Sequence, residues 1–149
     1  MTELAAAERA HQLKRDIGLK LNVLARQLRN RFDRQVSNLN VTRSQWTMIV
    51  VVARNPGATQ RVIAEALEMS EASAGRLIDR LCADGLLERQ ERYDDRRARA
   101  VYLTKAAEPL LDKLGELARE GEKSVFRGFS DDELDALKGY LDRIYKNVG

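Results

Sequence analysis

Residues 59–104, TQRVIAEALEMSEASAGRLIDRLCADGLLERQERYDDRRARAVYLT, decide the fold of this chain. From Thr59 to Leu67 the apolar residues recur at helical spacing and predict a short helix. After a break, Ser70 can cap a second helix that runs to about Ala83. The apolar side of this second helix consists of Ala74, Leu77, Ile78 and Leu81. Two short helices separated by a tight turn are typical of a helix-turn-helix.

The second half of the stretch predicts a β-hairpin. Leu86 to Arg92 and Arg99 to Leu103 have the character of short strands, and they enclose a polar tip, Tyr93 to Ala98. Every cation of this hairpin is an arginine: Arg89, Arg92, Arg96, Arg97 and Arg99. A guanidinium is flat and weakly hydrated, so it enters a narrow minor groove more readily than an ammonium. The hairpin is a candidate DNA-contacting wing, and the alternative is a charged turn that only improves solubility.

Helices are also predicted on the N-terminal side of this stretch. From Leu13 to about Val36 the apolar residues recur in steps of three and four, which predicts one long amphipathic helix. Thr42 and Gln45 have the spacing of a capping box, in which each side chain satisfies a free backbone N–H of the other residue. They predict the start of a short, mostly buried helix that ends at Asn55-Pro56-Gly57.

Two more helices follow the hairpin. Thr104 can cap the first, but Pro109 would fall about one turn inside it, so we expect a kink or a late start there. Ser130 and Glu133 form a second capping box at the start of the last helix. The expected fold is therefore mainly α, with about six helices and a small β-hairpin wing.

The patterns divide the chain into two regions with different charge. Residues 41–103 are assigned to a winged helix-turn-helix lobe, and residues 1–40 and 104–149 to a helical dimerisation body. The net charge is +3, but residues 1–43 hold nine positive and four negative charges, whereas residues 61–100 hold eight and nine. Any DNA binding must therefore come from the placement of a few cations and not from the total charge.

The composition excludes several other classes of protein. One Cys and one His among 149 residues exclude an intrachain disulfide and a Cys/His zinc site, so no metal is expected. There is no glycine-rich phosphate loop and no plausible catalytic set, so we expect neither an enzyme nor a cofactor. No apolar run approaches the ~20 residues of a membrane span, and the start of the chain lacks the order of a secretory signal. We therefore expect a cytoplasmic protein.

The second helix of the pair has an outward side suited to DNA. On a helical wheel this side carries Ala72, Arg76, Asp79 and Ala83, with Ser73, Gly75 and Arg80 at its flanks. A helix that enters a major groove needs small residues near its N-terminus, where its backbone approaches the DNA, and long cations a turn later to hold phosphates. Ala72, Ser73 and Arg76 meet that description. The alternative is an ordinary solvated helix face.

The run from Thr59 to Thr104 resembles the MarR family of winged helix-turn-helix regulators. The matching motifs are Ile63-Ala64, Arg76-Leu77-Ile78-Asp79-Arg80-Leu81, Gly85-Leu86-Leu87-Glu88-Arg89, Asp95-Arg96-Arg97 and Leu103-Thr104. Outside this core, Thr42 to Trp46 and Leu103 to Leu110 look most like the SlyA branch. The resemblance covers roughly residues 13–146.

The resemblance implies a homodimeric, sequence-specific transcriptional regulator that binds double-stranded DNA. The first, fifth and sixth helices would form the shared body. The predicted DNA-binding residues are Ser70, Glu71, Ala72, Ser73, Arg76 and Arg80 in the recognition helix, and Asp95, Arg96 and Arg97 in the wing. Arg97 matches the minor-groove arginine of the family, and Asp95 matches the acid that orients the wing. The alternative is a winged-helix module that binds a partner protein without specific DNA binding.

Many MarR relatives bind small aromatic acids, and the resemblance places such an effector beside Arg26, Gln45, Trp46 and Ile49. An arginine could meet the carboxylate of the effector there, beside an apolar wall. The alternative is that Trp46 belongs to the core and Arg26 is solvated. Cys82 lies at the edge of the core side of the second helix, and we expect it to be an inert, half-buried thiol.

Gly75 departs from the common pattern, in which a larger residue stands at this position. Glycine lowers helix stability by ~1 kcal/mol relative to alanine. Because Ala72 and Gly75 are so small, few side chains remain to read base edges. We therefore expect operator choice to depend more on the arginine wing and on DNA shape than on direct base readout.

Replacing Arg97 with alanine is accordingly expected to weaken operator binding and to reduce the preference for the operator over random DNA. Competition gel shifts with labelled operator and unlabelled random duplex measure both quantities. An unchanged affinity together with an unchanged preference would contradict the hypothesis.

Overall fold

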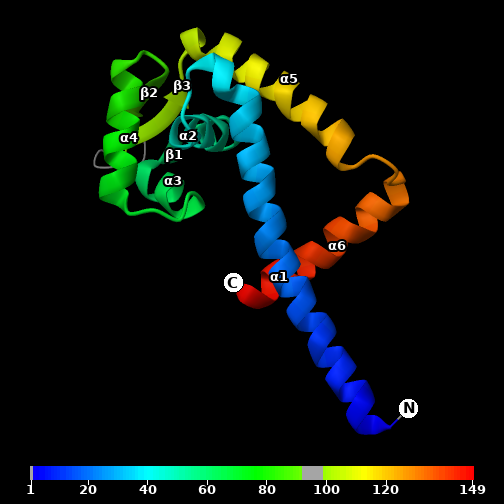
Figure 1. Cartoon of the computed structure of the whole chain (residues 1–149). Helices are drawn as coiled ribbons and strands as arrows, with labels where there is room; N and C mark the ends of the chain where they lie inside the picture. Colours follow the sequence, from blue (N-terminus) through cyan, green and yellow to red (C-terminus); the bar gives the residue numbers. More distant parts are fainter. Residues whose placement is uncertain (1, 92–98) are drawn as a thin grey trace. The chain divides into compact units, whose positions relative to one another are not determined.

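The computed structural model describes residues 2–91 and 99–149 (Figure 1). Its helices and strands follow the predicted order, so the expected mainly α fold with a small sheet is confirmed. By the contacts between its residues, the chain divides into two units, residues 1–117 and 118–149. Within the described ranges, no helix combines the length and the apolar character that crossing a membrane would require.

Helix α1 spans Glu3–Val36 and begins earlier than the predicted apolar stripe. The side chain of Thr2 caps it by accepting the Ala5 N–H at 3.2 Å. The extra turns are rich in alanine, the residue with the highest helix propensity, so they are helical without an apolar stripe. A short 3-10 turn, Ser37–Leu39, follows and ends at Asn40, whose left-handed φ of 56° stops the helix.

Helix α2 spans Arg43–Arg54 and starts at the predicted capping box. The Gln45 N–H donates to Thr42 Oγ1 at 3.2 Å, and the Thr42 N–H donates to Gln45 Oε1 at 2.9 Å. The helix ends where Asn55, Pro56 and Gly57 form a turn, as predicted.

The winged lobe contains α2, two further helices and a three-stranded sheet. The elements that follow α2 are β1 (Ala58–Thr59), α3 (Gln60–Ala66), α4 (Glu71–Ala83), β2 (Leu87–Glu91) and β3 (Arg99–Leu103). The sheet order is β1-β3-β2, and both pairs of strands are antiparallel. Strand β1 is not predicted from the sequence, because an alternating pattern cannot show in two residues. The predicted wing tip lies outside the described residues.

Two groups of buried side chains hold residues 1–117 together. The core of the lobe draws on α2, α3, α4 and the two longer strands, and consists of Met48, Val52, Ile63, Ile78, Leu81, Leu87 and Val101. The second group joins α1 and α2 to α5 (Glu108–Val125) through Val36, Ile49 and Leu114. The lobe therefore has its own core, and a separate one attaches it to the long helices.

Helix α5 starts late, as Pro109 predicts. A 3-10 turn, Lys105–Ala107, precedes it, and Pro109 stands in the first turn of α5, where its missing N–H is not needed. The expectation that Thr104 caps this helix with its side chain is wrong. The Thr104 hydroxyl donates instead to the Gly85 carbonyl oxygen at 2.6 Å, which ties the end of β3 to the turn after α4.

Helix α6 spans Asp131–Val148 in the second unit and starts at the predicted capping box. The Glu133 N–H donates to Ser130 Oγ at 3.1 Å, and the Ser130 N–H donates to Glu133 Oε1 at 2.9 Å. The backbone hydrogen bond from Ser130 favours the charged carboxylate and lowers the pKa of Glu133. None of the residues of α6 is buried, so its apolar side lies uncovered in the single chain.

Replacing Ile78 with alanine is expected to lower the free energy of unfolding by about 2 to 5 kcal/mol, because it empties fully buried space in the lobe core. Urea unfolding followed by circular dichroism measures the change. The control is Val62→Ala on α3, where the side chain is 45% exposed and the expected loss is below about 1 kcal/mol. Equal losses in the two variants would show that Ile78 does not belong to the core.

Candidate nucleic-acid interface

Serines organise the N-terminus of α4. Ser70 caps the helix: its Oγ accepts the Ser73 N–H at 3.0 Å and donates to Ser73 Oγ at 2.9 Å. Arg76 Nη2 donates to the same Ser73 oxygen at 3.2 Å. The guanidinium of Arg76 therefore lies along the first turn of α4, close to the positive end of the helix dipole.

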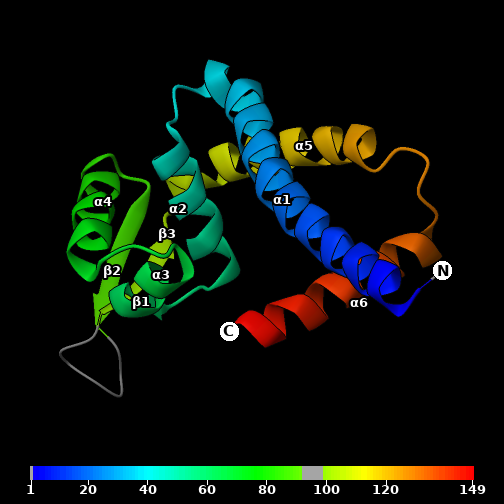
Figure 2. The same ribbon diagram turned by 60° about the horizontal axis from the view of Figure 1, so that its bottom comes forward.

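The outward side of α4 is open, as the helical wheel predicts. Glu71, Ala72, Arg76 and Arg80 are exposed, and Ser73 is half-buried. Helix α4 lies at the outer edge of the lobe beside β2 in both views (Figure 1, Figure 2). Ala72, Arg76 and Arg80 thus share one accessible side of α4, whereas Glu71 is exposed at the first position of the helix.

The predicted wing contacts Asp95, Arg96 and Arg97 lie outside the described residues, and their role in DNA binding stays a prediction. Of the five hairpin arginines, Arg89 and Arg99 belong to the described strands.

Arg89 is not one of the groove-reaching arginines that the hairpin sequence predicts. Its side chain is 19% exposed, and its Nη1 donates to Asp79 Oδ1 of α4 at 2.5 Å. The reason is the period of two in a strand: Arg89 lies on the same face of β2 as the buried Leu87, and this face points toward α4. A guanidinium held in this way is not available to a DNA groove.

Gly75 also lies elsewhere than the helical wheel places it. It is buried where α3 and α4 meet, and a Cβ at this position would lie 2.7 Å from Gln60 Nε2. Its small size therefore serves the packing of α3 against α4 and not the approach of α4 to DNA. A helical wheel cannot reveal this, because it contains no neighbouring helix. The expectation that few side chains of α4 read base edges was based on the small size of Ala72 and Gly75. With Gly75 buried, it depends on Ala72.

The four residues of the predicted effector site have different surroundings. Arg26 is exposed on α1, and Gln45 caps α2 with its side-chain oxygen. Ile49 is completely buried in the group that joins α1, α2 and α5. Trp46 is half-buried, and its indole N–H donates to Asp33. Binding of an aromatic acid among these residues stays a prediction.

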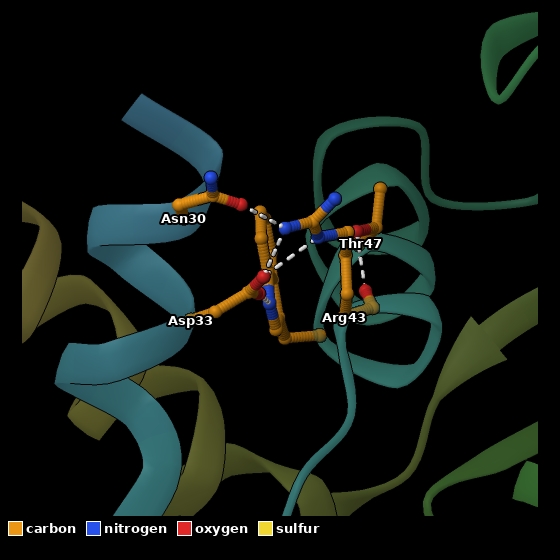
Figure 3. Close-up of polar contacts among 5 residues, drawn as sticks. Asn30, Asp33, Arg43 and Thr47 are labelled. Atoms are coloured by element: carbon orange, nitrogen blue, oxygen red, sulfur yellow. Dashed lines mark hydrogen bonds and ion pairs between the residues drawn. The ribbon is translucent and has the colours of Figure 1, made fainter. Parts of the chain in front are cut away.

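Asp33, near the end of α1, connects α1 to α2 (Figure 3). Its Oδ2 accepts from Arg43 Nε at 2.7 Å, and its Oδ1 accepts from Trp46 Nε1 at 2.8 Å. Arg43 Nη2 also donates to Asn30 Oδ1 of α1 at 2.7 Å. The ring of Phe32 packs edge-on against the indole, with 4.7 Å between the ring centroids. These contacts hold the first helix of the lobe against the long helix.

Electrostatics favour the charged form of Asp33. The hydrogen bond from Arg43 lowers the pKa of its carboxyl, partial burial opposes this, and the hydrogen bond from Trp46 lowers it further. Sequence reasoning missed this cluster. The available signal was the spacing of Asn30 and Asp33, which places both on one side of α1, away from the apolar stripe.

Cys82 is half-buried, as predicted. Burial raises the pKa of its thiol, which favours the less reactive protonated form. Among the described residues, no group of three or more His, Cys, Asp or Glu side chains is placed to hold a metal ion.

A helix-turn-helix with a following β-hairpin packed against it defines a winged-helix protein. Residues 39–98, which form most of this lobe, match the model of the MarR family. The solved transcriptional regulator SlyA is 29% identical over 89% of this chain and 94% of its own, with a TM-score of 0.77. The transcriptional regulator PA3341 is 28% identical over 89% of this chain and 97% of its own, with a TM-score of 0.82.

A third solved structure is a putative MarR family regulator from Listeria monocytogenes, complexed with a 26mer DNA. It is 22% identical over 90% of this chain and 87% of its own, with a TM-score of 0.76, and it shares the fold. The family match in the lobe and the likeness along most of the chain agree. The winged lobe is thus similar to the MarR family over residues 39–98, and most of the chain has the fold of these solved transcriptional regulators.

Replacing Asp33 with asparagine is expected to lower the free energy of unfolding by about 1 to 2 kcal/mol at pH 7, because the charged partner of Arg43 is lost. The lowered pKa of Asp33 means that its stabilisation is present above the unfolded pKa of about 4 and is lost as the pH falls through the folded value. The difference between the two proteins should therefore shrink below about pH 4.

Urea unfolding of both proteins between pH 7 and pH 2.5 measures this difference. Asp16→Asn is the control, since Asp16 is an exposed acid of the same helix that accepts a hydrogen bond from Gln12, one turn earlier. A difference that stays constant down to the lowest pH would contradict the role of the Asp33 charge.

Proposed function

We propose that this protein is a homodimer that binds a specific double-stranded operator through α4 and the hairpin and thereby regulates transcription. The observation that carries the proposal is the open outward side of α4, where Ala72 and Arg76 are exposed next to the capped helix N-terminus. Backbone N–H groups and the helix dipole make such an N-terminus favourable for a DNA phosphate.

The side chains suggest how the recognition helix divides its contacts. Arg76 and Arg80 lie one turn apart and are both exposed, so they suit phosphates on the edge of a major groove. Ala72 lets the backbone approach the bases and suits contact with a thymine methyl group, and the exposed carboxylate of Glu71 suits a cytosine amino group. The predicted wing arginines, Arg96 and Arg97, would enter the adjacent minor groove.

Comparison supports DNA binding by this fold. The Listeria monocytogenes regulator, whose structure contains a 26mer DNA, has the same fold as this chain. Within the family we place the chain in a SlyA-like branch, which the 29% identity to SlyA supports.

Uncovered apolar stripes support a homodimer. On α1 the exposed residues of the stripe are Leu13, Ile17, Leu24 and Leu28, and on α6 they are Leu137, Tyr140, Leu141 and Ile144. Apolar surface of this extent marks an interface, and a second copy of the chain would cover it. Two-fold symmetry would then place the two α4 helices about 34 to 36 Å apart on a pseudo-palindromic operator.

Replacing Arg76 with alanine is expected to weaken operator binding and to make it less dependent on salt. Loss of one phosphate contact should reduce the slope of log K against log salt by about 0.9. Fluorescence anisotropy at several salt concentrations measures affinity and slope together. The control is Arg127→Ala, which removes an exposed arginine outside the lobe and should change neither. If the unaltered protein binds no genomic fragment specifically, the proposal fails and the partner-protein alternative gains weight.

Replacing Leu141 with aspartate is expected to convert the dimer to monomers, because it places a charge in the apolar stripe of α6, where the side chain is 40% exposed in the single chain. Sedimentation velocity measures the mass, and operator affinity should fall with it. Lys146→Asp introduces the same acid at an exposed position on the opposite side of α6 and should leave the dimer intact. Persistence of the dimer in both variants would exclude this stripe as the interface.

A further inference from the structure

The contact between the hairpin and the recognition helix is organised around one arginine. The Nη1 atom of Arg89 in β2 donates to Asp79 Oδ1 in α4 at 2.5 Å. Its Nη2 atom lies 3.4 Å from both the Gly75 carbonyl oxygen and Gln60 Oε1. The first contact is short and charge-assisted, whereas the other two are at the limit of hydrogen bonding. The pair with Asp79 is therefore the strongest of the polar contacts that Arg89 makes between β2 and α4.

Gln60 connects α3 to the same place. Its Nε2 donates to the Glu71 carbonyl oxygen at 2.9 Å, in the first turn of α4, while its Oε1 faces Arg89. One amide therefore touches both the N-terminal turn of the recognition helix and the guanidinium from the hairpin.

Gly75 provides the space for this arrangement. A Cβ on Gly75 would lie 2.7 Å from Gln60 Nε2, which is closer than real Cβ atoms approach, and 3.1 Å from Gln60 Cδ, which is tighter than most such contacts. A larger residue would displace the Gln60 amide from its two partners. Gln60, Gly75, Asp79 and Arg89 therefore form one unit, which we name the Arg89 junction.

The charge of Asp79 gives the junction a further purpose. The Asp79 side chain is 68% exposed on the outward side of α4, the side that carries Arg76. An unpaired carboxylate at this position would repel DNA phosphates. Arg89 supplies the opposite charge from the hairpin.

We infer that Arg89 is a positioning residue for DNA binding, which sets the angle of the hairpin to α4 through Asp79 and contacts no phosphate itself. A hairpin already held at the angle that DNA requires loses less conformational freedom on binding, so the contacts of α4 and of the wing form together. This inference rests on the proposed function, since it concerns how the same interface binds the operator.

The direction in which Asp79→Ala changes operator affinity distinguishes a positioning role of the pair from simple repulsion of DNA by the Asp79 carboxylate. If Asp79 holds Arg89, removing the carboxylate should weaken operator binding about tenfold, although it removes a negative charge from the DNA-binding side. If Asp79 were only an acid near DNA, the same change should strengthen binding. Asp84→Ala, which removes an exposed carboxylate just after the same helix, is the matched control and should not weaken binding.

Variants of Arg89 test the other half of the pair. Arg89→Met should weaken binding about as much as Asp79→Ala, and the double variant should lose little more than either single one, because both remove the same contact. The slope of log K against log salt should stay unchanged in Arg89→Met. A slope reduced by about 0.9 would show a phosphate contact and overturn the inference. Arg89→Lys keeps one donor for Asp79 and should bind with intermediate affinity.

Hydrogen exchange, which needs no DNA, tests the positioning role of Arg89 separately from the proposed function. Hydrogen exchange of the backbone amides of β2 should be faster in Arg89→Met and Asp79→Ala than in the unaltered protein, and unchanged in Asp84→Ala. Absence of operator binding by the unaltered protein would reject the proposed function, while hydrogen exchange still tests the junction. Specific binding by the unaltered protein with equal affinity in Asp79→Ala would reject the positioning role alone. Circular dichroism verifies that each variant is folded.

Discussion

Burial of the apolar side of α4 is the constraint on which the winged lobe depends. Ile78 and Leu81 are fully buried in a core that α2, α3 and the strands complete. An amphipathic helix can bury only one stripe, so packing that stripe inward turns Ala72 and Arg76 outward. The candidate DNA-binding side is thus a direct consequence of the lobe core, and the two cannot be altered independently.

Two ion pairs between an arginine and an aspartate then orient elements of the lobe relative to the elements they pack against. Asp33 and Arg43 connect α1 to α2, and Asp79 and Arg89 connect α4 to β2. Partly exposed ion pairs of this kind contribute modestly to stability. Their geometry is directional, however, because a guanidinium presents its donors in a fixed plane. We therefore assign them mainly to orientation, with the free energy of folding supplied by the apolar cores.

These pairs also explain why net charge is a poor guide in this protein. Residues 61–100 hold nine acids and eight basic residues, yet Asp79 is matched by Arg89 and Glu71 stands in the first turn of α4, where the helix dipole favours it. Arg43, one of the many cations of the N-terminal third, is likewise engaged by Asp33. The cations that remain on the outward side of α4 include Arg76 and Arg80. For DNA binding, their positions matter more than the net charge of the segment.

The sequence by itself determined the features that depend on near neighbours along the chain. The capping boxes at Thr42 and Ser130, the helix-turn-helix and the late start of α5 all follow from local spacing and were predicted. Only the tertiary structure decided the burial of Gly75, the inward direction of Arg89 and the contact of Asp33 with α2. Each depends on a residue at least ten positions away, and periodicity carries no information on which elements will pack together. The use of an arginine, in a groove or in a junction, is therefore decided by its neighbours in space.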